Sequence, residues 1–326
     1  MDALGNIEKL LGGELVDFRR SYAHALESDN PLLKEVAAHI LARRGKQLRP
    51  MLVLLAAKLC HGVNEKTLDA AVAFELLHTA SLVHDDVVDD SPLRRGVETI
   101  QKRWTNKVAV LTGDYLLSKV IEITAGLRNQ KIFNIVGEIG QTLASGELLQ
   151  LHANRSMWIS EADYYSVIEK KTASLFAACT QAGAVSSGAS MRAETALRTF
   201  GMELGMIFQM KDDLLDYSDS DEAGKPTMSD IRDGKATLPL LVSLERAPKA
   251  EAEEIRRLAE RLSAGEIQDE EQSILSFVLR YDGIRYVRQQ MEVHKRRAIE
   301  ALSVFHDSSV KAAMIQLLEY TIARVY

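Results

Sequence analysis

Two acidic clusters of the same form constrain what this chain can be. Residues 81–90 read Ser-Leu-Val-His-Asp-Asp-Val-Val-Asp-Asp, and residues 212–216 read Asp-Asp-Leu-Leu-Asp. Apolar residues with helical spacing precede each cluster and turn residues follow it, so we expect both clusters to end α-helices. Asp85 and Asp89 then lie four residues apart on one helix face, and the second cluster repeats this arrangement.

Such a cluster is unfavourable for folding. Like charges four residues apart repel, and a helix C-terminus carries partial negative charge, each at a cost of a few tenths to about 1 kcal/mol. Proteins hold Mg²⁺ through one or two carboxylates together with phosphate oxygens and water. One cluster alone is as readily a solvated acidic helix end, but two copies, each followed by basic residues, favour metal. We therefore predict that the clusters face each other across a diphosphate and bind Mg²⁺ through Asp85, Asp89, Asp212 and Asp216.

The composition predicts an all-α protein. Of the 326 residues, 46% are hydrophobic and only 6 are proline. Ala, Leu, Glu, Lys and Arg dominate most windows and no linker interrupts them, so we expect residues 1–326 to form a single helical domain. The net charge of −6 argues against nucleic acid as a partner.

The cysteines and the apolar runs indicate a cytoplasmic protein. Cys60 and Cys179 are isolated in apolar helical stretches, as in proteins whose thiols stay reduced. We see no signal peptide at the N-terminus and no run long enough to span a bilayer. We therefore expect at most peripheral membrane contact.

Turn signals divide the chain into predicted helices. We expect them at residues 3–28, 31–44, 50–61, 66–90, 106–125, 130–154, 161–188 and 192–217, and again from residue 238 to the C-terminus. Between the last two lies one long polar loop, residues 218–236, which carries Lys225 and Lys235. We predict that this loop is a lid that closes on anion and metal.

Cations suited to phosphate accompany the clusters. Lys46 and Arg49 lie at the predicted start of a helix, where free N–H groups and the helix dipole favour anions, although exposed cations there are also ordinary. Arg94 and Arg95 follow the first cluster and can each donate forked hydrogen bonds to phosphate, and balancing the charge of Asp89 and Asp90 would coexist with that role. Both pairs are candidate diphosphate ligands.

Four polar residues inside predicted helices are further candidates. His78 lies two turns before Asp85 on the same face, and the pattern leaves open whether it packs or bonds a diphosphate. Lys171 and Thr172 interrupt a small, apolar face, so they either reach a cavity or lie on an exposed flank. Gln209 precedes the second cluster by one turn on its face.

Together these motifs resemble those of the trans-type polyprenyl diphosphate synthases, the family of farnesyl, geranylgeranyl and longer-chain synthases. The resemblance covers essentially the whole chain, because six elements occur in the family's order. They are Gly45-Lys46-x-x-Arg49-Pro50, His78 to Gly96 with the first cluster, Lys171-Thr172, Gln209 with the second cluster, Lys225 and Lys235.

The resemblance implies an all-α bundle around a deep central cavity, usually a homodimer. It implies head-to-tail condensation of isopentenyl diphosphate with an allylic diphosphate, farnesyl or geranyl, with Mg²⁺ as cofactor. Isopentenyl diphosphate would bind Lys46, Arg49, His78 and Arg95. The allylic diphosphate would bind through metal on Asp85, Asp89 and Asp212, and through Arg94, Lys171, Thr172, Gln209, Lys225 and Lys235. The implied catalytic residues are Asp85, Asp86, Asp89, Arg94, Lys171, Asp212, Asp213 and Lys225.

Product length depends on the space below the first cluster. Ala80 and Ser81 lie roughly 6 to 8 Å from Asp85 along the helix at 1.5 Å per residue, with Leu77 beyond them. Short-chain members commonly have an aromatic residue there, so small residues resemble the long-chain branch. We expect a heptaprenyl to decaprenyl product, octaprenyl as the single best choice, for quinone side chains. The alternative is a short-chain farnesyl or geranylgeranyl synthase.

Three other classes fit the sequence less well. A terpene cyclase would not need a second diphosphate site, and a regulatory subunit of a heteromeric synthase would lack one acidic cluster. A di-iron carboxylate bundle needs two Glu-x-x-His pairs, and only Glu75 and His78 have that spacing. The role of Lys211, directly before the second cluster, stays open.

Overall fold

The structure is a computed structural model that describes residues 3–42, 45–94, 96–153, 156–217, 228–267 and 270–324. Helices make up 81% of it and strands 1%, which confirms the all-α prediction. In these ranges the one sheet is a hairpin of β1 (Leu93–Arg94) and β2 (Val97–Glu98), which the sequence did not predict. None of the helices described is both long and apolar enough to cross a membrane.

The helix boundaries agree with most predicted ranges to within a few residues. In chain order the helices are α1 (Ala3–Ala25), α2 (Pro31–Leu41), α3 (Leu48–Cys60), α4 (Glu65–Val88), α5 (Ile100–Arg103), α6 (Asn106–Gly126), α7 (Gln130–Ala153), α8 (Glu161–Ile168), η1 (Glu169–Ala173), α9 (Ser174–Ser186), α10 (Met191–Leu215), α12 (Ser229–Arg232), α13 (Leu238–Arg246), α14 (Lys249–Ser263), α15 (Glu271–Arg280), α16 (Gly283–Ala301), η2 (Leu302–Val304) and α17 (Ser309–Ala323).

Two predicted ranges need correction. The helix expected at 161–188 is divided into α8 and α9 by η1, a turn of π-helix. The range 218–236 is not a continuous loop, because the short helix α12 lies within it. Neither feature follows from hydrophobic periodicity, which reports a face of a helix and not its hydrogen-bonding register.

Contacts divide the chain into two compact units, each assembled from segments distant in sequence. The first unit comprises Met1–Gly140, Phe176–Arg198 and Val304–Met314, and the second comprises Gln141–Leu175, Thr199–Ser303 and Ile315–Tyr326. The first acidic cluster therefore belongs to the first unit and the second cluster to the second unit. The single domain, the central cavity and the facing of the two clusters stay predictions.

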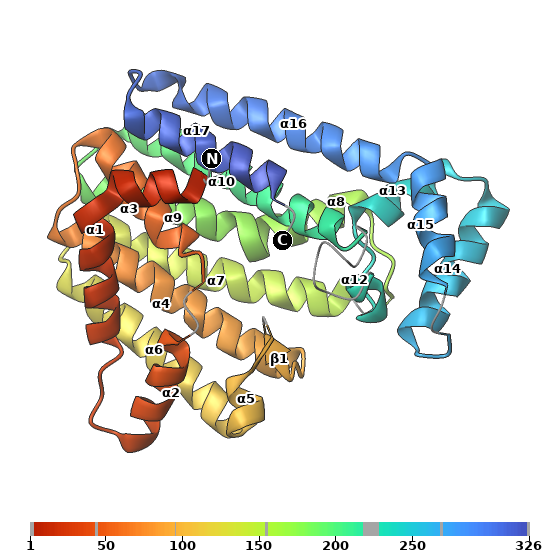
Figure 1. The fold of residues 1–326 in the computed structure, drawn as a ribbon, viewed down its shortest axis with the longest axis horizontal. Helices are drawn as coiled ribbons and strands as arrows, with labels where there is room; N and C mark the ends of the chain where they lie inside the picture. The colour runs from red at the N-terminus through yellow and green to blue at the C-terminus, as the bar shows by residue number, and fades with distance from the viewer. Residues whose placement is uncertain are drawn as a thin grey trace. The chain divides into compact units, whose positions relative to one another are not determined.

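Helix α4 is at the centre of the first unit and packs against α1, α3 and α6. Its N-terminus is fixed by a capping box, in which the Asn64 side chain accepts a hydrogen bond from the Thr67 N–H at 3.0 Å. It lies along α6 (Figure 1), where Gly113 allows close approach: a Cβ there would lie 2.1 Å from Nε2 of His84. This packing holds the C-terminal end of α4, which carries the first cluster.

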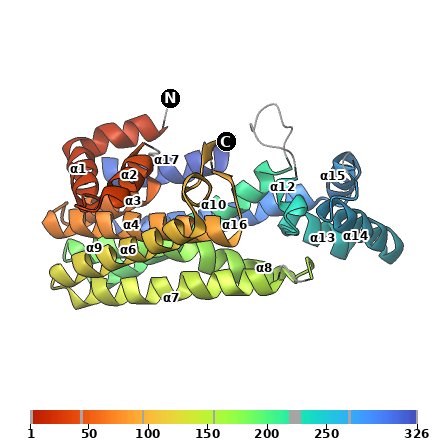
Figure 2. The same cartoon turned by 90° about the horizontal axis from the view of Figure 1, so that it is seen from below.

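The second unit contains the C-terminal half of α10 and the helices that follow it. Helices α13, α14 and α15 pack on one another, as Figure 2 shows, and α13 also packs on α16. Gly205 of α10 faces η1 so closely that a Cβ on it would lie 2.4 Å from the Cα of Ala173. This contact sets the end of α10 beside η1.

Candidate active site

The first acidic cluster lies at the C-terminal end of α4. Asp89 is the C-cap, and its N–H bonds to the carbonyl of Asp85 at 2.8 Å, so the two residues are one helical turn apart as predicted. Asp85 is half-buried and Asp89 is exposed. Asp86, in contrast, is only 6% exposed. Asp90 is exposed as well, so Asp86 is the one aspartate of this cluster that is turned into the protein.

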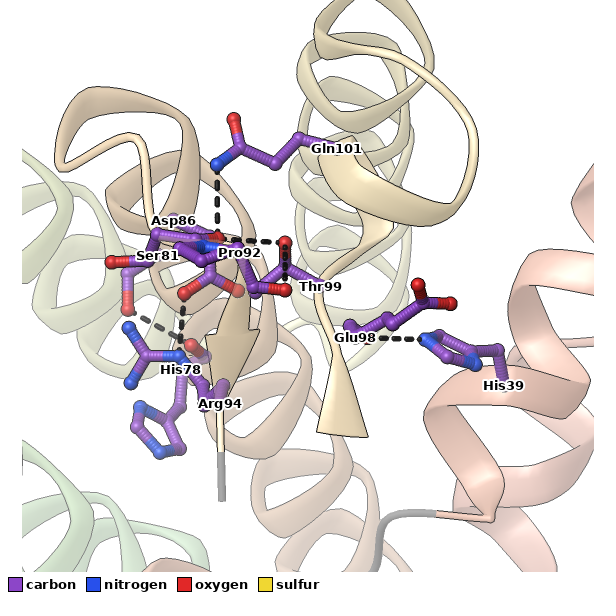
Figure 3. A network of polar contacts seen from close by, with 10 residues as sticks. His39, His78, Ser81, Asp86, Pro92, Arg94, Glu98, Thr99 and Gln101 are labelled. Atoms are coloured by element: carbon purple, nitrogen blue, oxygen red, sulfur yellow. Dashed lines mark hydrogen bonds and ion pairs between the residues drawn. The ribbon is translucent and has the colours of Figure 1, made fainter. Parts of the chain in front are cut away.

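The buried Asp86 holds Arg94 beside the cluster. Nε of Arg94 donates to Oδ1 of Asp86 at 2.6 Å, and Arg94 stands on strand β1 of the hairpin (Figure 3). The hydroxyl of Thr99 and the side-chain amide of Gln101 donate to the Ser91 carbonyl at 2.8 and 3.0 Å, which ties the hairpin to the end of α4. Arg94 therefore balances the negative charge of one aspartate of the cluster, Asp86.

Arg49 and His78, both predicted to bind isopentenyl diphosphate, lie together. Nη1 of Arg49 donates to Nε2 of His78 at 2.9 Å, and the guanidinium lies 5.0 Å from the centre of the Phe176 ring. Lys46 is exposed just before α3. Between them, Gln47 has a φ of 52° and accepts a hydrogen bond from Arg19 at 2.8 Å. The chain thus turns so that the N-terminus of α3 carries both cations.

The three residues proposed to set product length differ in exposure. Leu77 is 4% exposed and Ala80 is fully buried, at 0%. Ser81 is half-buried, and its hydroxyl donates to the carbonyl of His78 at 2.9 Å. Of the three, Ser81 has the most surface open to a growing chain, whereas a bulky residue at position 80 would have to displace its neighbours.

The second cluster ends α10, and its three aspartates have different environments. Asp212 keeps 41% of its side chain exposed and pairs with Nη2 of Arg324 at 2.8 Å. Asp213 is 4% exposed. It accepts hydrogen bonds from the Tyr164 hydroxyl at 2.5 Å and from the Gln209 amide at 2.9 Å. Asp212 is therefore the more open of the two, and Asp213 joins α10 to α8.

Asp216 lies just after α10, and its carboxylate accepts hydrogen bonds from the first two residues of α12. Its Oδ1 accepts from the backbone N–H and the hydroxyl of Ser229 at 2.8 and 2.7 Å, and its Oδ2 accepts from the Asp230 N–H at 3.1 Å. A carboxylate has about four lone-pair sites, so roughly one remains. Metal binding by Asp216 stays a prediction that must be reconciled with these bonds.

A chain of polar contacts links η1 to Asp213. The Thr172 hydroxyl donates to Oε1 of Gln209 at 2.8 Å, and the amide of the same Gln209 donates to Asp213. Thr172 is in η1, and single turns of π-helix within α-helices are frequent at functional sites. Thr172 and Gln209, which were predicted separately, therefore form one network.

Lys171, also in η1, is not an exposed flank residue. Its Nζ donates to Glu147 and to Gln150 on α7, both at 2.6 Å, and 23% of its side chain is exposed. A lysine held from two sides is a fixed point charge, which suits a role in binding phosphate. Its contact with substrate stays a prediction.

The structure describes one of the two loop lysines. Lys235 is described: its N–H bonds to the Asp230 carbonyl at 2.8 Å, and its Nζ lies 3.9 Å from Asp233. Lys225 and Arg95 lie outside the described residues. The lid that we predict for this segment therefore stays a prediction.

The donor set of the clusters fits Mg²⁺, since all the candidate ligands are carboxylates. Burial raises the pKa of Asp213, the charges of Asp212 and Asp216 raise it further, and the two hydrogen bonds to it act in the opposite direction. A bound cation would relieve such crowding of like charges. Within the described ranges, no three His, Cys, Asp or Glu side chains gather into a metal cage.

Sequence reasoning missed the residues that support the aspartates. Tyr164 and Arg324 lie 49 and 112 positions from their partners, Asp213 and Asp212. Glu147, which holds Lys171, had no motif of its own. No local signal marks these residues, because each gains its role only through tertiary packing.

Comparison with known proteins gives a consistent answer. The family model for polyprenyl synthetase matches residues 30–278. The octaprenyl diphosphate synthase of Haemophilus influenzae is 33% identical over 325 residues, 99% of this chain and 98% of that protein.

Solved structures agree along the full length. A polyprenyl synthase of Caulobacter crescentus, determined with calcium and isoprenyl diphosphate, has a TM-score of 0.91 and 32% identity, with 99% of this chain and 98% of that chain covered. The geranylgeranyl pyrophosphate synthase of Bacteroides thetaiotaomicron has a TM-score of 0.84 and 38% identity, with 99% and 100% covered. The chain belongs to the polyprenyl synthetase family and is a prenyltransferase.

Proposed function

We propose that the protein joins isopentenyl diphosphate head to tail, by 1'-4 condensation, to farnesyl or geranyl diphosphate. Repetition gives a long all-trans polyprenyl diphosphate, with octaprenyl the best single choice, for a quinone side chain. The observation that carries the long product is the pair of small residues, Ala80 and Ser81, one turn before the acidic end of α4. The name of the Haemophilus influenzae relative supports the same length.

Asp85, Asp89, Asp212 and the remaining lone pair of Asp216 would hold Mg²⁺. Bound there, Mg²⁺ would stabilise the negative charge that develops on the departing diphosphate. Asp86 and Asp213, being buried, would act by positioning Arg94 and Gln209. This divides each cluster into ligands and supports.

The remaining charged and polar residues would hold the two diphosphates. Arg49 with His78, together with Lys46 and Arg95, would hold isopentenyl diphosphate. The allylic diphosphate would lie against Arg94, Lys171, Thr172, Gln209, Lys225 and Lys235. When the diphosphate group leaves the allylic substrate, the isopentenyl double bond attacks the resulting allylic cation, and the released diphosphate accepts the last proton. The chemistry requires no nucleophilic side chain.

A second copy of the chain would cover the apolar face of α6. Val110, Leu111 and Ile121 on this helix are 40%, 67% and 58% exposed. Val110 and Ile121 are three turns apart and share a face, so the apolar surface extends along the helix. Such surfaces mark protein interfaces, which supports a homodimer.

Product analysis tests the proposal. Purified protein is incubated with Mg²⁺, labelled isopentenyl diphosphate and farnesyl diphosphate, and the dephosphorylated products are separated by chromatography. We expect a dominant prenol of eight isoprene units. The Bacteroides thetaiotaomicron structure favours the alternative, a short-chain synthase. A product that stops after one addition would establish that alternative.

A further inference from the structure

A pocket of about 350 Å³ lies in the second unit, against the end of α10, α15 and α16. Its apolar walls are Leu214 and Tyr217 near the end of α10, Leu275 and Leu279 on α15, and Ile284 on α16. Leu279 is 57% exposed, so one apolar wall is open to solvent. The volume is at the lower end of the roughly 300–1,000 Å³ typical of ligand sites, which suits one short apolar chain.

Two cations line the same pocket. Lys211 is one turn before Leu214 on α10, and Arg288 is one turn after Ile284 on α16. In the part of the chain that the structure describes, neither has a carboxylate within 4.0 Å. Because both side chains line one pocket, the two positive charges are near one another. Among the described residues, positive charge without a paired carboxylate therefore lies beside apolar walls.

We propose that this pocket binds a short-chain prenyl phosphate or diphosphate outside the reaction site. Its anionic head would contact Lys211 and Arg288, and its chain would lie along Leu275, Leu279 and Ile284. The match is one of charge and size: a neutral prenyl alcohol lacks the head, inorganic phosphate lacks the chain, and a two-chain phospholipid exceeds the volume. None of the residues that line this pocket is needed for the condensation proposed above.

The pocket lies beside a candidate metal ligand. Lys211 is adjacent to Asp212, whose ion pair with Arg324 would compete with metal. An anion on Lys211 and Arg288 would neutralise positive charge beside Asp212. An effect of the bound prenyl phosphate on the condensation rests on the proposed function, whereas binding itself does not.

Calorimetric titration with geranyl monophosphate tests the site. The full-length protein is titrated in EDTA, so that binding does not depend on metal at the acidic clusters or on the condensation reaction. Arg288→Met removes one head contact, Leu279→Asp places a charge on the wall, and Arg285→Met is the matched control on the same helix. We expect about tenfold weaker binding or more for the first two and a change within about twofold for the control.

Further titrations separate the possible ligands. Inorganic phosphate and geraniol are expected to bind about a hundredfold more weakly than geranyl monophosphate. The proposal is overturned if Arg288→Met and Leu279→Asp, each with unchanged thermal unfolding, bind like the unaltered protein. It is also overturned if inorganic phosphate binds as tightly as geranyl monophosphate. Binding of phosphatidylglycerol vesicles without binding of geranyl monophosphate would overturn it too. The product assay above is scored separately, so failure of one does not conceal failure of the other.

Discussion

Replacing Ser81 with Phe should shorten the product sharply. Ser81 is half-buried one turn before Asp85, and the aromatic ring would occupy the space that we assign to the growing chain. Each isoprene unit buries five carbons. A chain stopped at this point therefore loses about 4 kcal/mol of favourable burial free energy per unit, at ~0.8 kcal/mol per carbon. At about 1.4 kcal/mol per factor of ten, the yield should fall roughly a thousandfold for each unit beyond the ring.

The assay compares product ladders of Ser81→Phe and Ser81→Ala, with farnesyl diphosphate as primer. Ser81→Ala removes the hydroxyl bonded to His78 but adds no bulk, so its ladder should match that of the unaltered protein. Ala80→Phe is the less informative change, because Ala80 is fully buried and the added ring should cost about 1–3 kcal/mol of stability by overpacking. A folded, active Ser81→Phe protein with an unchanged ladder would refute our placement of the chain.

Three further predictions concern the second unit and α6. Tyr164→Phe removes the hydrogen bond to buried Asp213 and should lower the free energy of unfolding by about 1–3 kcal/mol; identical urea midpoints would argue against it. Arg324→Met removes the charge that competes with metal for Asp212. It should tighten Mg²⁺ binding a few-fold in calorimetry, since a partly exposed pair is worth about 1 kcal/mol or less, and weaker binding would contradict the competition. Leu111→Asp with Ile121→Asp should convert a dimer to a monomer in sedimentation, whereas Met191→Asp, at a residue 75% exposed on α10, should not; a dimer that survives the α6 changes would place the interface elsewhere.

The fold class and the acidic helix ends could be predicted because their causes are local. Ser91 and Pro92 stop α4 just after the first cluster, and helical periodicity alone places Asp85 and Asp89 one turn apart. The hairpin that follows was missed. Its strands are two residues each, too short for an alternating pattern to register.

The roles within each acidic cluster could not be predicted, because the pattern is the same in both. In each, the second aspartate is the buried one: Asp86 pairs with Arg94, and Asp213 is held by Tyr164 and Gln209. Burial is a property of the packed protein, and the partner of Asp213 on α8 is 49 residues away. Sequence therefore indicates where carboxylates gather, and tertiary contacts determine which of them face solvent.

The contact between Gly205 and Ala173 has a consequence for variation in this protein. Because no side chain separates the two backbones, even one methyl group at position 205 would push η1 away and pull the Thr172 hydroxyl from Gln209. The spacing of two helices, not the chemistry of any side chain, thus adjusts this polar network. Conditional alleles that weaken activity with rising temperature, while every polar residue of the site is retained, should therefore arise at Gly205.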